Sequence, residues 1–220
     1  MLLTRYGRRE WLLATIAATP VLTGFAAMGW WWAAAATGAS WLGVASFFRD
    51  PARRAPADLE PGAMLSPADG RVTAVERVDH HPAADGPAVV IRIFLSILNV
   101  HVNRSPCSGQ VREIDYTPGR FHDARSPESA RENESNLITM RLAGNESIGV
   151  RQVAGKIARR IVCAVRVGDR LARGQRFGMI KFGSTTELIL PRPDDVEVHV
   201  KVGDRVKGGL TCLATVSFLR

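Results

Sequence analysis

Two segments of the chain share one pattern: Val167-Gly168-Asp169-Arg170-Leu171 and Val202-Gly203-Asp204-Arg205-Val206. A glycine follows each copy, at Gly174 and at Gly208. Gly-Asp between short apolar runs is a signal for a tight turn between two β-strands. The two copies therefore predict two similar β-hairpins related by approximate symmetry, as in sandwich folds built of repeated hairpins. Two copies are too few for a solenoid.

The sequence around these copies is typical of short strands. Apolar runs are interrupted by glycine, proline and aspartate, and residues 89–95 form a β-branched run. In the next segment, Val100 and Val102 should face one way while Asn99, His101 and Asn103 face the other, because side chains alternate along a strand. Further strands are predicted at residues 71–75, 148–153, 161–167, 177–182, 186–190, 196–202 and 213–218.

Helix signals in this part of the chain are sparse. Ser126 as an N-cap and Pro127 at the first helical position predict one helix that starts near residue 126. The expected fold class is therefore mostly β: a β-sandwich or barrel-like domain of repeated hairpins with few helices.

The amino-terminal part is different, because residues 11–48 carry no charge. This run is roughly twice as long as one membrane helix needs to be. Trp30, Trp31 and Trp32 lie in its middle, where a turn between two helices would meet a membrane interface. We expect a tight helical hairpin or a pair of half-inserted helices that precedes the β domain. A single tilted helix, a cleaved signal peptide and a buried core helix are the alternatives.

Composition and charge support a membrane-associated enzyme or binding module. The chain has 220 residues and a net charge of +8, which suits an anionic partner. Arginines flank the uncharged run on both sides, so both flanks are expected on the cytoplasmic side. Arg49, Arg53 and Arg54 are expected to bind anionic headgroups, at about 1 kcal/mol each. The sequence has no basic stripe with interleaved aromatic residues, which argues against nucleic acid as the partner. Its three cysteines are too scattered to form a disulfide framework.

The sequence divides into three parts. Residues 1–48 form the expected membrane-associated segment, residues 49–62 a basic, proline-rich linker, and residues 63–220 the β domain. The linker is expected to lie along the membrane surface.

Three polar positions could carry chemistry: Asp69, His101 and Ser184. Each has an ordinary structural reading, because Asp69-Gly70 and Gly183-Ser184 are turn signals and a lone histidine is more often a structural residue. Serine, histidine and aspartate can also act as a nucleophile, a base and an orienting group. The GxSxG pattern of one large hydrolase class is absent. No pair of histidines has the spacing of metal ligands, so no metal is expected.

Taken together, several motifs make the chain similar to the phosphatidylserine decarboxylases, in their short prokaryotic form. The resemblance covers about residues 45–216. The motifs that carry it are Phe48-Arg49-Asp50-Pro51, Ser66-Pro67-Ala68-Asp69-Gly70, Asn99-Val100-His101-Val102-Asn103-Arg104, Glu132-Asn133-Glu134, Gln152-Val153-Ala154-Gly155 with residues 157–161, and Arg176-Phe177-Gly178 leading to Phe182-Gly183-Ser184.

The resemblance implies a proenzyme that cuts itself between Gly183 and Ser184. It implies a β chain of residues 1–183 and an α chain of residues 184–220, whose Ser184 becomes a covalent pyruvoyl cofactor. By the family pattern, His101 takes the serine proton and Asp69 orients His101. Longer bacterial members have a second histidine where this chain has Arg104. His101 would then serve both self-cleavage and decarboxylation, or Arg104 would contribute charge only.

The resemblance further implies the reaction and the location. The pyruvoyl carbonyl condenses with the amine of phosphatidylserine and acts as an electron sink while CO2 leaves, which gives phosphatidylethanolamine. The enzyme would act at the cytoplasmic face of an anionic cell membrane. An archaetidylserine decarboxylase with the same mechanism is an alternative. A membrane-tethered biotinyl or lipoyl carrier is another, although neither Lys181 nor Lys201 has the setting of a modified lysine. The sequence leaves the oligomeric state open.

Overall fold

The computed structural model of the protein describes residues 2–126, 128–156, 160–181 and 183–219. Pro127, residues 157–159 and Phe182, on which parts of the expectations above fall, lie outside these ranges. The chain divides into two compact units, Met1–Ala52 and Arg53–Arg220.

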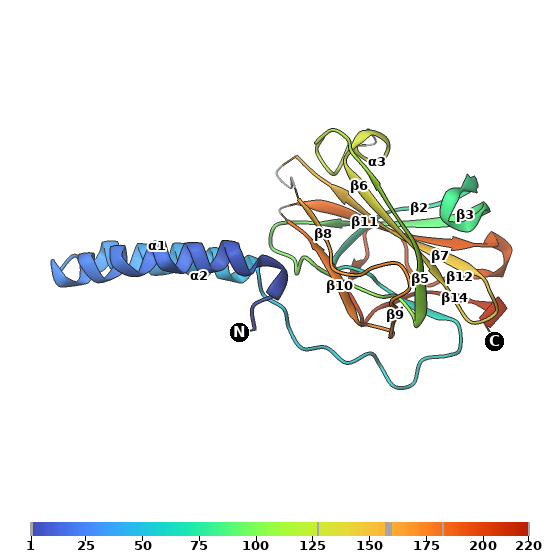
Figure 1. The fold of residues 1–220 in the computed structure, drawn as a ribbon, viewed down its shortest axis with the longest axis horizontal. Coiled ribbons are helices and arrows are strands. Elements are labelled where there is room, and N and C mark those ends of the chain that lie inside the picture. The colour runs from blue at the N-terminus through green and yellow to red at the C-terminus, as the bar shows by residue number, and fades with distance from the viewer. Residues whose placement is uncertain (1, 127, 157–159, 182, 220) are drawn as a thin grey trace. The chain divides into compact units, whose positions relative to one another are not determined.

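The amino-terminal unit is a helical hairpin, as expected. A short helix η1 (Arg5–Gly7) leads into α1 (Arg8–Ala27), and α2 (Trp31–Phe47) returns beside it (Figure 1). Gly29 adopts a positive φ of 72° in the turn between the helices, with Trp30 next to it. Trp41 Nε1 donates to Thr15 Oγ1 at 2.9 Å and so ties the two helices together. The helix over Arg5–Ala27 is long and apolar enough to cross a membrane, which makes it a candidate anchor.

The second unit is built around an eight-stranded antiparallel sheet in the order β13-β2-β3-β11-β7-β6-β5-β9 (Figure 1). The two shortest strands, β13 and β9, lie at its edges, and β11 lies in the middle, bonded to β3 on one side and to β7 on the other. The strands span β2 (Gly70–His81), β3 (Gly86–Leu95), β5 (Gly109–Thr117), β6 (Ser135–Arg141), β7 (Ser147–Ala154), β9 (Arg170–Leu171), β11 (Ser184–Pro191) and β13 (Arg205–Val206).

Two three-stranded sheets contribute the opposite side of the core. One has the order β1-β14-β12 and the other β4-β10-β8. Buried side chains of the large sheet, such as Ile91 and Leu188, belong to one hydrophobic cluster with Phe177 of β10 and Leu213 of β14. These sheets span β1 (Ala63–Leu65), β14 (Cys212–Val216), β12 (Val196–Val198), β4 (Val102–Arg104), β10 (Arg176–Ile180) and β8 (Ile161–Cys163). The expected mostly-β sandwich is therefore confirmed.

The described helices of this unit are short. They are η2 (Pro82–Ala84), α3 (Ser129–Glu132), η3 (Pro193–Asp195) and η4 (Ser217–Leu219). Helix α3 begins at Ser129 with Glu128 at its N-cap, two residues after the predicted N-cap Ser126. The hydroxyl of Ser126 nevertheless accepts a hydrogen bond from the Ser129 amide at 3.3 Å.

The repeated Val-Gly-Asp-Arg segments lie at the two edges of the large sheet, where they form β9 and β13. Their contacts are the same in both copies. The Gly168 amide donates to the Val111 carbonyl at 2.8 Å, and the Gly203 amide donates to the Val72 carbonyl at 2.8 Å. The predicted approximate symmetry is confirmed, but each copy is a turn and an edge strand rather than a complete hairpin.

The symmetry extends to a second repeat that the sequence reasoning missed. Residues 66–72 read Ser-Pro-Ala-Asp-Gly-Arg-Val, and residues 105–111 read Ser-Pro-Cys-Ser-Gly-Gln-Val. In each copy the serine hydroxyl bonds a carbonyl two residues on: Ser66 Oγ that of Ala68 at 2.6 Å, and Ser105 Oγ that of Cys107 at 2.7 Å. The domain is thus two related halves, one with β2 and β13 and the other with β5 and β9.

Two predicted strands are shorter than expected. The run 161–167 is a strand only to Cys163, and the run 196–202 only to Val198. The cause is the turn after each strand. Asp169 Oδ2 accepts from the Arg166 amide at 2.8 Å and Asp204 Oδ2 from the Lys201 amide at 2.9 Å, so each aspartate bends the backbone before the strand can continue.

Candidate active site

The Gly183–Ser184 bond lies at the start of the central strand β11. Gly183 adopts a positive φ of 66°, a conformation that glycine adopts without strain. Ser184 is the first residue of β11 and pairs with Leu95 of β3 and Ala154 of β7. Its side chain is completely buried, and its Oγ has no hydrogen-bond partner among the described residues. An unpaired buried hydroxyl costs about 1–3 kcal/mol, so it calls for a functional explanation.

The backbone of Gly155 lies directly against the carbonyl of Gly183. A Cβ atom at residue 155 would lie only 2.2 Å from the Gly183 oxygen and 3.1 Å from the Ala124 Cβ. Thr185 Oγ1 donates to the Ala124 carbonyl at 3.1 Å on the other side of the strand. The bond is therefore enclosed by the end of β7 and by the segment around residue 124. Gly155 belongs to a motif quoted above, but the sequence assigned it no role.

Asn133 fixes this enclosing segment to β7. It is buried, and its Nδ2 donates to the carbonyls of His122 at 3.0 Å and Ala154 at 2.8 Å. Its Oδ1 accepts from the His122 amide at 2.8 Å. The Asn133 of the Glu-Asn-Glu motif thus connects the segment to the residue that pairs with Ser184.

The side chain of His101 lies between the Asn99 carbonyl and the Gly183 amide. Its Nδ1 is 3.0 Å from the Asn99 oxygen, and its Nε2 accepts from the Gly183 amide at 3.5 Å. A carbonyl can only accept, so Nδ1 carries the proton in this arrangement. The neutral ring then leaves Nε2 unprotonated, and this basic nitrogen faces the residue before Ser184. His101 is completely buried, whereas the sequence placed it on a polar strand face.

Asp69 is bound elsewhere. Arg53 donates to both its carboxylate oxygens, at 2.5 and 2.8 Å, and the Gly208 amide donates to Oδ1 at 2.8 Å. Among the described residues, the Asn99 carbonyl contacts His101 Nδ1 and the Arg53 guanidinium holds the Asp69 carboxylate in a two-point pair, so a contact between Asp69 and His101 stays a prediction.

The same contact corrects the expectation for Arg53. Its side chain is only 10% exposed and is bound to Asp69, so it is not available for membrane headgroups. Arg54 remains exposed.

Arg104, at the position of the second histidine of longer relatives, is buried and donates from Nη1 to the Gly174 carbonyl at 3.2 Å.

A row of buried polar side chains follows Ser184 along the inner face of the sheet. Asn103 Nδ2 donates to Thr186 Oγ1 at 3.1 Å, and Gln152 Nε2 donates to Asn103 Oδ1 at 2.9 Å. Asn136 Nδ2 donates to Gln152 Oε1 at 3.1 Å. Thr186 lies on the same strand face as Ser184, because residues two apart share a face. The row positions β4, which follows His101, against β11, which begins at Ser184.

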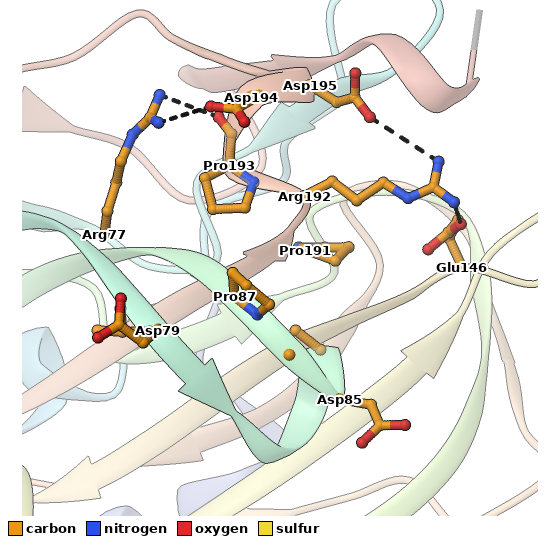
Figure 2. A pocket seen from close by; sticks show the side chains of 13 residues that line it. Arg77, Asp79, Asp85, Pro87, Glu146, Pro191, Arg192, Pro193, Asp194 and Asp195 are labelled. Atoms are coloured by element: carbon orange, nitrogen blue, oxygen red, sulfur yellow. Dashed lines mark hydrogen bonds and ion pairs between the residues drawn. The ribbon is translucent and has the colours of Figure 1, made fainter.

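One hollow, of about 630 Å³, lies at the opposite end of β11 around Pro191 and Arg192. Figure 2 shows that both of its arginines pair with acidic side chains of the same hollow: Arg77 Nη1 is 2.9 Å from Asp194 Oδ1, and Arg192 Nη2 is 2.6 Å from Glu146 Oε1. A strand of this length extends roughly 20 Å, so the hollow is remote from Ser184. Among the described residues no group of histidine, cysteine, aspartate or glutamate side chains could hold a metal.

Comparisons with known proteins agree with this site. A sequence profile described as phosphatidylserine decarboxylase matches residues 43–214. The chain is 43% identical over 202 residues to the phosphatidylserine decarboxylase proenzyme of Ralstonia nicotianae, an alignment that covers 89% of this chain and 87% of the relative. The corresponding proenzyme of Nitrosomonas europaea is 43% identical over 211 residues, with 94% and 93% covered. That of Desulfotalea psychrophila is 44% identical over 170 residues, with 77% and 78% covered.

The fold, the Gly-Ser bond at the head of β11 and these matches define an enzyme, a decarboxylase, rather than a carrier domain. The chain belongs to the phosphatidylserine decarboxylase family. A carrier domain would need an accessible lysine for its modification. Lys181, one of the two lysines considered for that role, is only 6% exposed, which argues against it.

Proposed function

We propose that this chain cuts itself between Gly183 and Ser184, and that the resulting enzyme converts phosphatidylserine to phosphatidylethanolamine and CO2. The relatives are named as proenzymes of that reaction. One observation in this chain carries the proposal: a buried serine hydroxyl without a partner among the described residues follows directly after a glycine with positive φ.

The self-cleavage chemistry uses the neighbours of that bond. Ser184 Oγ attacks the Gly183 carbonyl carbon, and His101 Nε2 takes the hydroxyl proton. The amide becomes an ester, and the Ser184 nitrogen becomes an amine. Removal of the Ser184 α-proton breaks the Cβ–O bond, which leaves residues 1–183 with a terminal carboxylate and a dehydroalanine at residue 184. Water then replaces the amine, ammonia leaves, and residues 184–220 begin with a pyruvoyl group.

His101 is the proposed base because of its hydrogen bonds. The Asn99 carbonyl holds the proton on Nδ1, so the ring presents an unprotonated Nε2 toward the cleavage bond. Asn99 is itself held, since its Oδ1 accepts from the Ser96 amide and the Ser96 hydroxyl, both at 2.9 Å. Asp69 is proposed as a positioning residue that acts through Gly208 rather than through the imidazole.

The site fits a pyruvoyl group at residue 184. Residue 184 is buried, and because Gly155 has no Cβ atom, there is space for the Gly183 carbonyl. When present, the group withdraws electrons from the substrate α-carbon as CO2 leaves. His101 is the candidate to return a proton to that carbon, because its Nε2 is 3.5 Å from the Gly183 amide. The row from Asn136 to Thr186 keeps β4 and β11 fixed during both reactions.

The amino-terminal unit supports a lipid substrate and a membrane location. The helix over Arg5–Ala27 would keep the enzyme at the bilayer that contains its lipid substrate. Basic residues on both flanks of the hairpin favour the cytoplasmic face. Residues 1–183 and 184–220 would remain together as the two chains of the mature enzyme.

The intact masses of the purified protein test this proposal. The wild-type chain should give two species, residues 1–183 and 184–220, the second lighter than a serine-terminated chain by one ammonia. Ser184→Ala should give a single uncut chain. Ser147→Ala is the matched control, because Ser147 Oγ is also buried and unpaired among the described residues but lies at the far end of β7. A single uncut wild-type chain that is folded and membrane-bound would contradict the proposal, as would two species from Ser184→Ala.

A further inference from the structure

The two related halves of the β domain differ sharply in charge at one place. Arg71 of β2 lies directly opposite Arg205 of β13. In the other half, the corresponding positions are Gln110 of β5 and Arg170 of β9. Like charges directly opposite each other on adjacent strands are destabilising. The half with β2 and β13 therefore carries an unfavourable pair that its counterpart lacks.

This pair lines a hollow of about 640 Å³. Lys207 adds a third cation to its wall, and Arg71, Arg205 and Lys207 are all exposed. A fourth, Arg125, is paired with Asp123. None of the other three forms an ion pair with a carboxylate in the described parts of the chain. Asp69 also lines the hollow, but its charge is already matched by Arg53. The hollow thus has a net positive charge, unlike the hollow of Figure 2, where acidic side chains outnumber the two arginines.

The hollow lies beside the candidate active site. Asn99 is part of its wall, and the Asn99 carbonyl binds His101 Nδ1, whose ring reaches the Gly183 amide through Nε2. Asn99 therefore links the wall of the hollow to the imidazole that contacts the Gly183 amide. In phosphatidylserine only a methylene and an ester oxygen separate the phosphorus from the carbon that loses CO2. A phosphate in the hollow would therefore hold that carbon next to the wall that Asn99 shares with the candidate site.

Two bulky aliphatic side chains stand at the rim. Leu98 lines the hollow and is 78% exposed, and its neighbour Ile97 is 54% exposed. Exposed apolar side chains next to a cationic patch are typical of surfaces that bind lipid bilayers. This combination favours a phosphate that carries acyl chains over a free phosphate.

We propose that Arg71, Arg205 and Lys207 bind the phosphodiester of the phospholipid substrate, while Ile97 and Leu98 insert among its acyl chains. Guanidinium groups suit this role because they bind phosphate oxygens in a two-point geometry. A bound anion also removes the repulsion between the two opposed arginines. The assignment rests on the proposed function, since it uses that reaction to identify the ligand.

The test compares Arg205→Gln with Arg170→Gln, the same change at the corresponding position of the other half. Binding of dihexanoyl-phosphatidylserine is measured by equilibrium dialysis, and CO2 release gives KM and kcat. Arg205→Gln and Lys207→Gln should each raise Kd and KM about tenfold, the loss expected for one charge-assisted hydrogen bond, with kcat within about twofold. Arg170→Gln should match the wild type. Intact mass and thermal unfolding verify that each variant is cut and folded.

Each outcome decides one part of the assignment. Unchanged Kd and KM in Arg205→Gln and Lys207→Gln would overturn the phosphate site. Equal affinity for glycerophosphoserine, which lacks acyl chains, would overturn the lipid and indicate a site for soluble phosphodiesters. If inorganic phosphate binds as tightly as the short-chain lipid, the hollow is a general anion site and its assignment to the substrate is overturned. If wild-type protein binds the short-chain lipid through Arg205 but releases no CO2, the phosphate site stands and the proposed function fails.

Discussion

Replacing Gly155 by alanine should slow self-cleavage without unfolding the domain. The new Cβ would lie 2.2 Å from the Gly183 oxygen, more than 1 Å inside ordinary contact. The neighbour is backbone, so the Gly183 carbonyl itself must move by about 1 Å. A misplacement of that size near a reacting bond costs about 100-fold in rate. We therefore expect cleavage of Gly155→Ala to be about 100-fold slower than in the wild type.

The matched control is Gly149→Ala in β7, the strand that ends just before Gly155. A Cβ there would meet the Ala83 Cβ at 2.6 Å, far from the cleavage bond. Both variants overpack a buried site and should lose about 1–3 kcal/mol of stability. A time course of chain cutting after synthesis, followed by mass spectrometry, separates the two effects. Only Gly155→Ala should cut slowly.

Cleavage of folded Gly155→Ala at the wild-type rate would refute this reasoning. It would mean that the carbonyl position set by Gly155 does not limit the attack by Ser184. Equal slowing in Gly149→Ala would also refute it, because the cause would then be a general loss of stability.

Three further predictions concern other residues. His101→Ala should slow self-cleavage at least about 100-fold, as expected for loss of a general base, by the same mass assay; normal cutting would move the base elsewhere, with His122 next to test. Arg53→Gln should lower the free energy of unfolding by about 3 kcal/mol, because it leaves the nearly buried Asp69 carboxylate unpaired. Arg77→Gln, which breaks an exposed pair, should cost at most about 1 kcal/mol; equal losses in a urea titration would contradict this. Burial raises the pKa of the Cys107 thiol to about 12, so iodoacetamide near pH 8 should leave Cys107 unmodified in the folded protein; peptide mapping that finds it alkylated before unfolding would count against that burial.

The sequence predicts well those elements whose signal is local. The uncharged run with its central tryptophans predicts the helical hairpin, and the β-branched run at 89–95 predicts β3. Strands β5 and β6 were missed for a physical reason. Much of β5 is exposed, and Arg112, Glu113 and Asp115 interrupt its apolar residues. The strand is held by its neighbours in the sheet rather than by its own pattern.

The candidate site shows the same limit. Ser184 and His101 were quoted from short motifs, but their surroundings depend on register between distant strands. The partner of His101 Nδ1 is a backbone carbonyl, which every residue has, so no sequence signal marks Asn99 for this role. Arg53 was expected at the membrane because the linker is basic, and only the fold shows that it reaches Asp69. The second repeat, at residues 66–72 and 105–111, is a signal in the sequence that could have predicted the two related halves of the domain.

The position of β11 has a consequence for the lifetime of a cut enzyme. Residues 184–220 supply β11 between β3 and β7, and also β13 and β14, which pair with β2 and β1. An uncut chain brings these strands together within one molecule, whereas two separated fragments would have to find each other in solution. Cutting would therefore make unfolding irreversible in dilute solution. The working life of the enzyme would then be set by its unfolding rate, and lost enzyme would be replaced only by new synthesis.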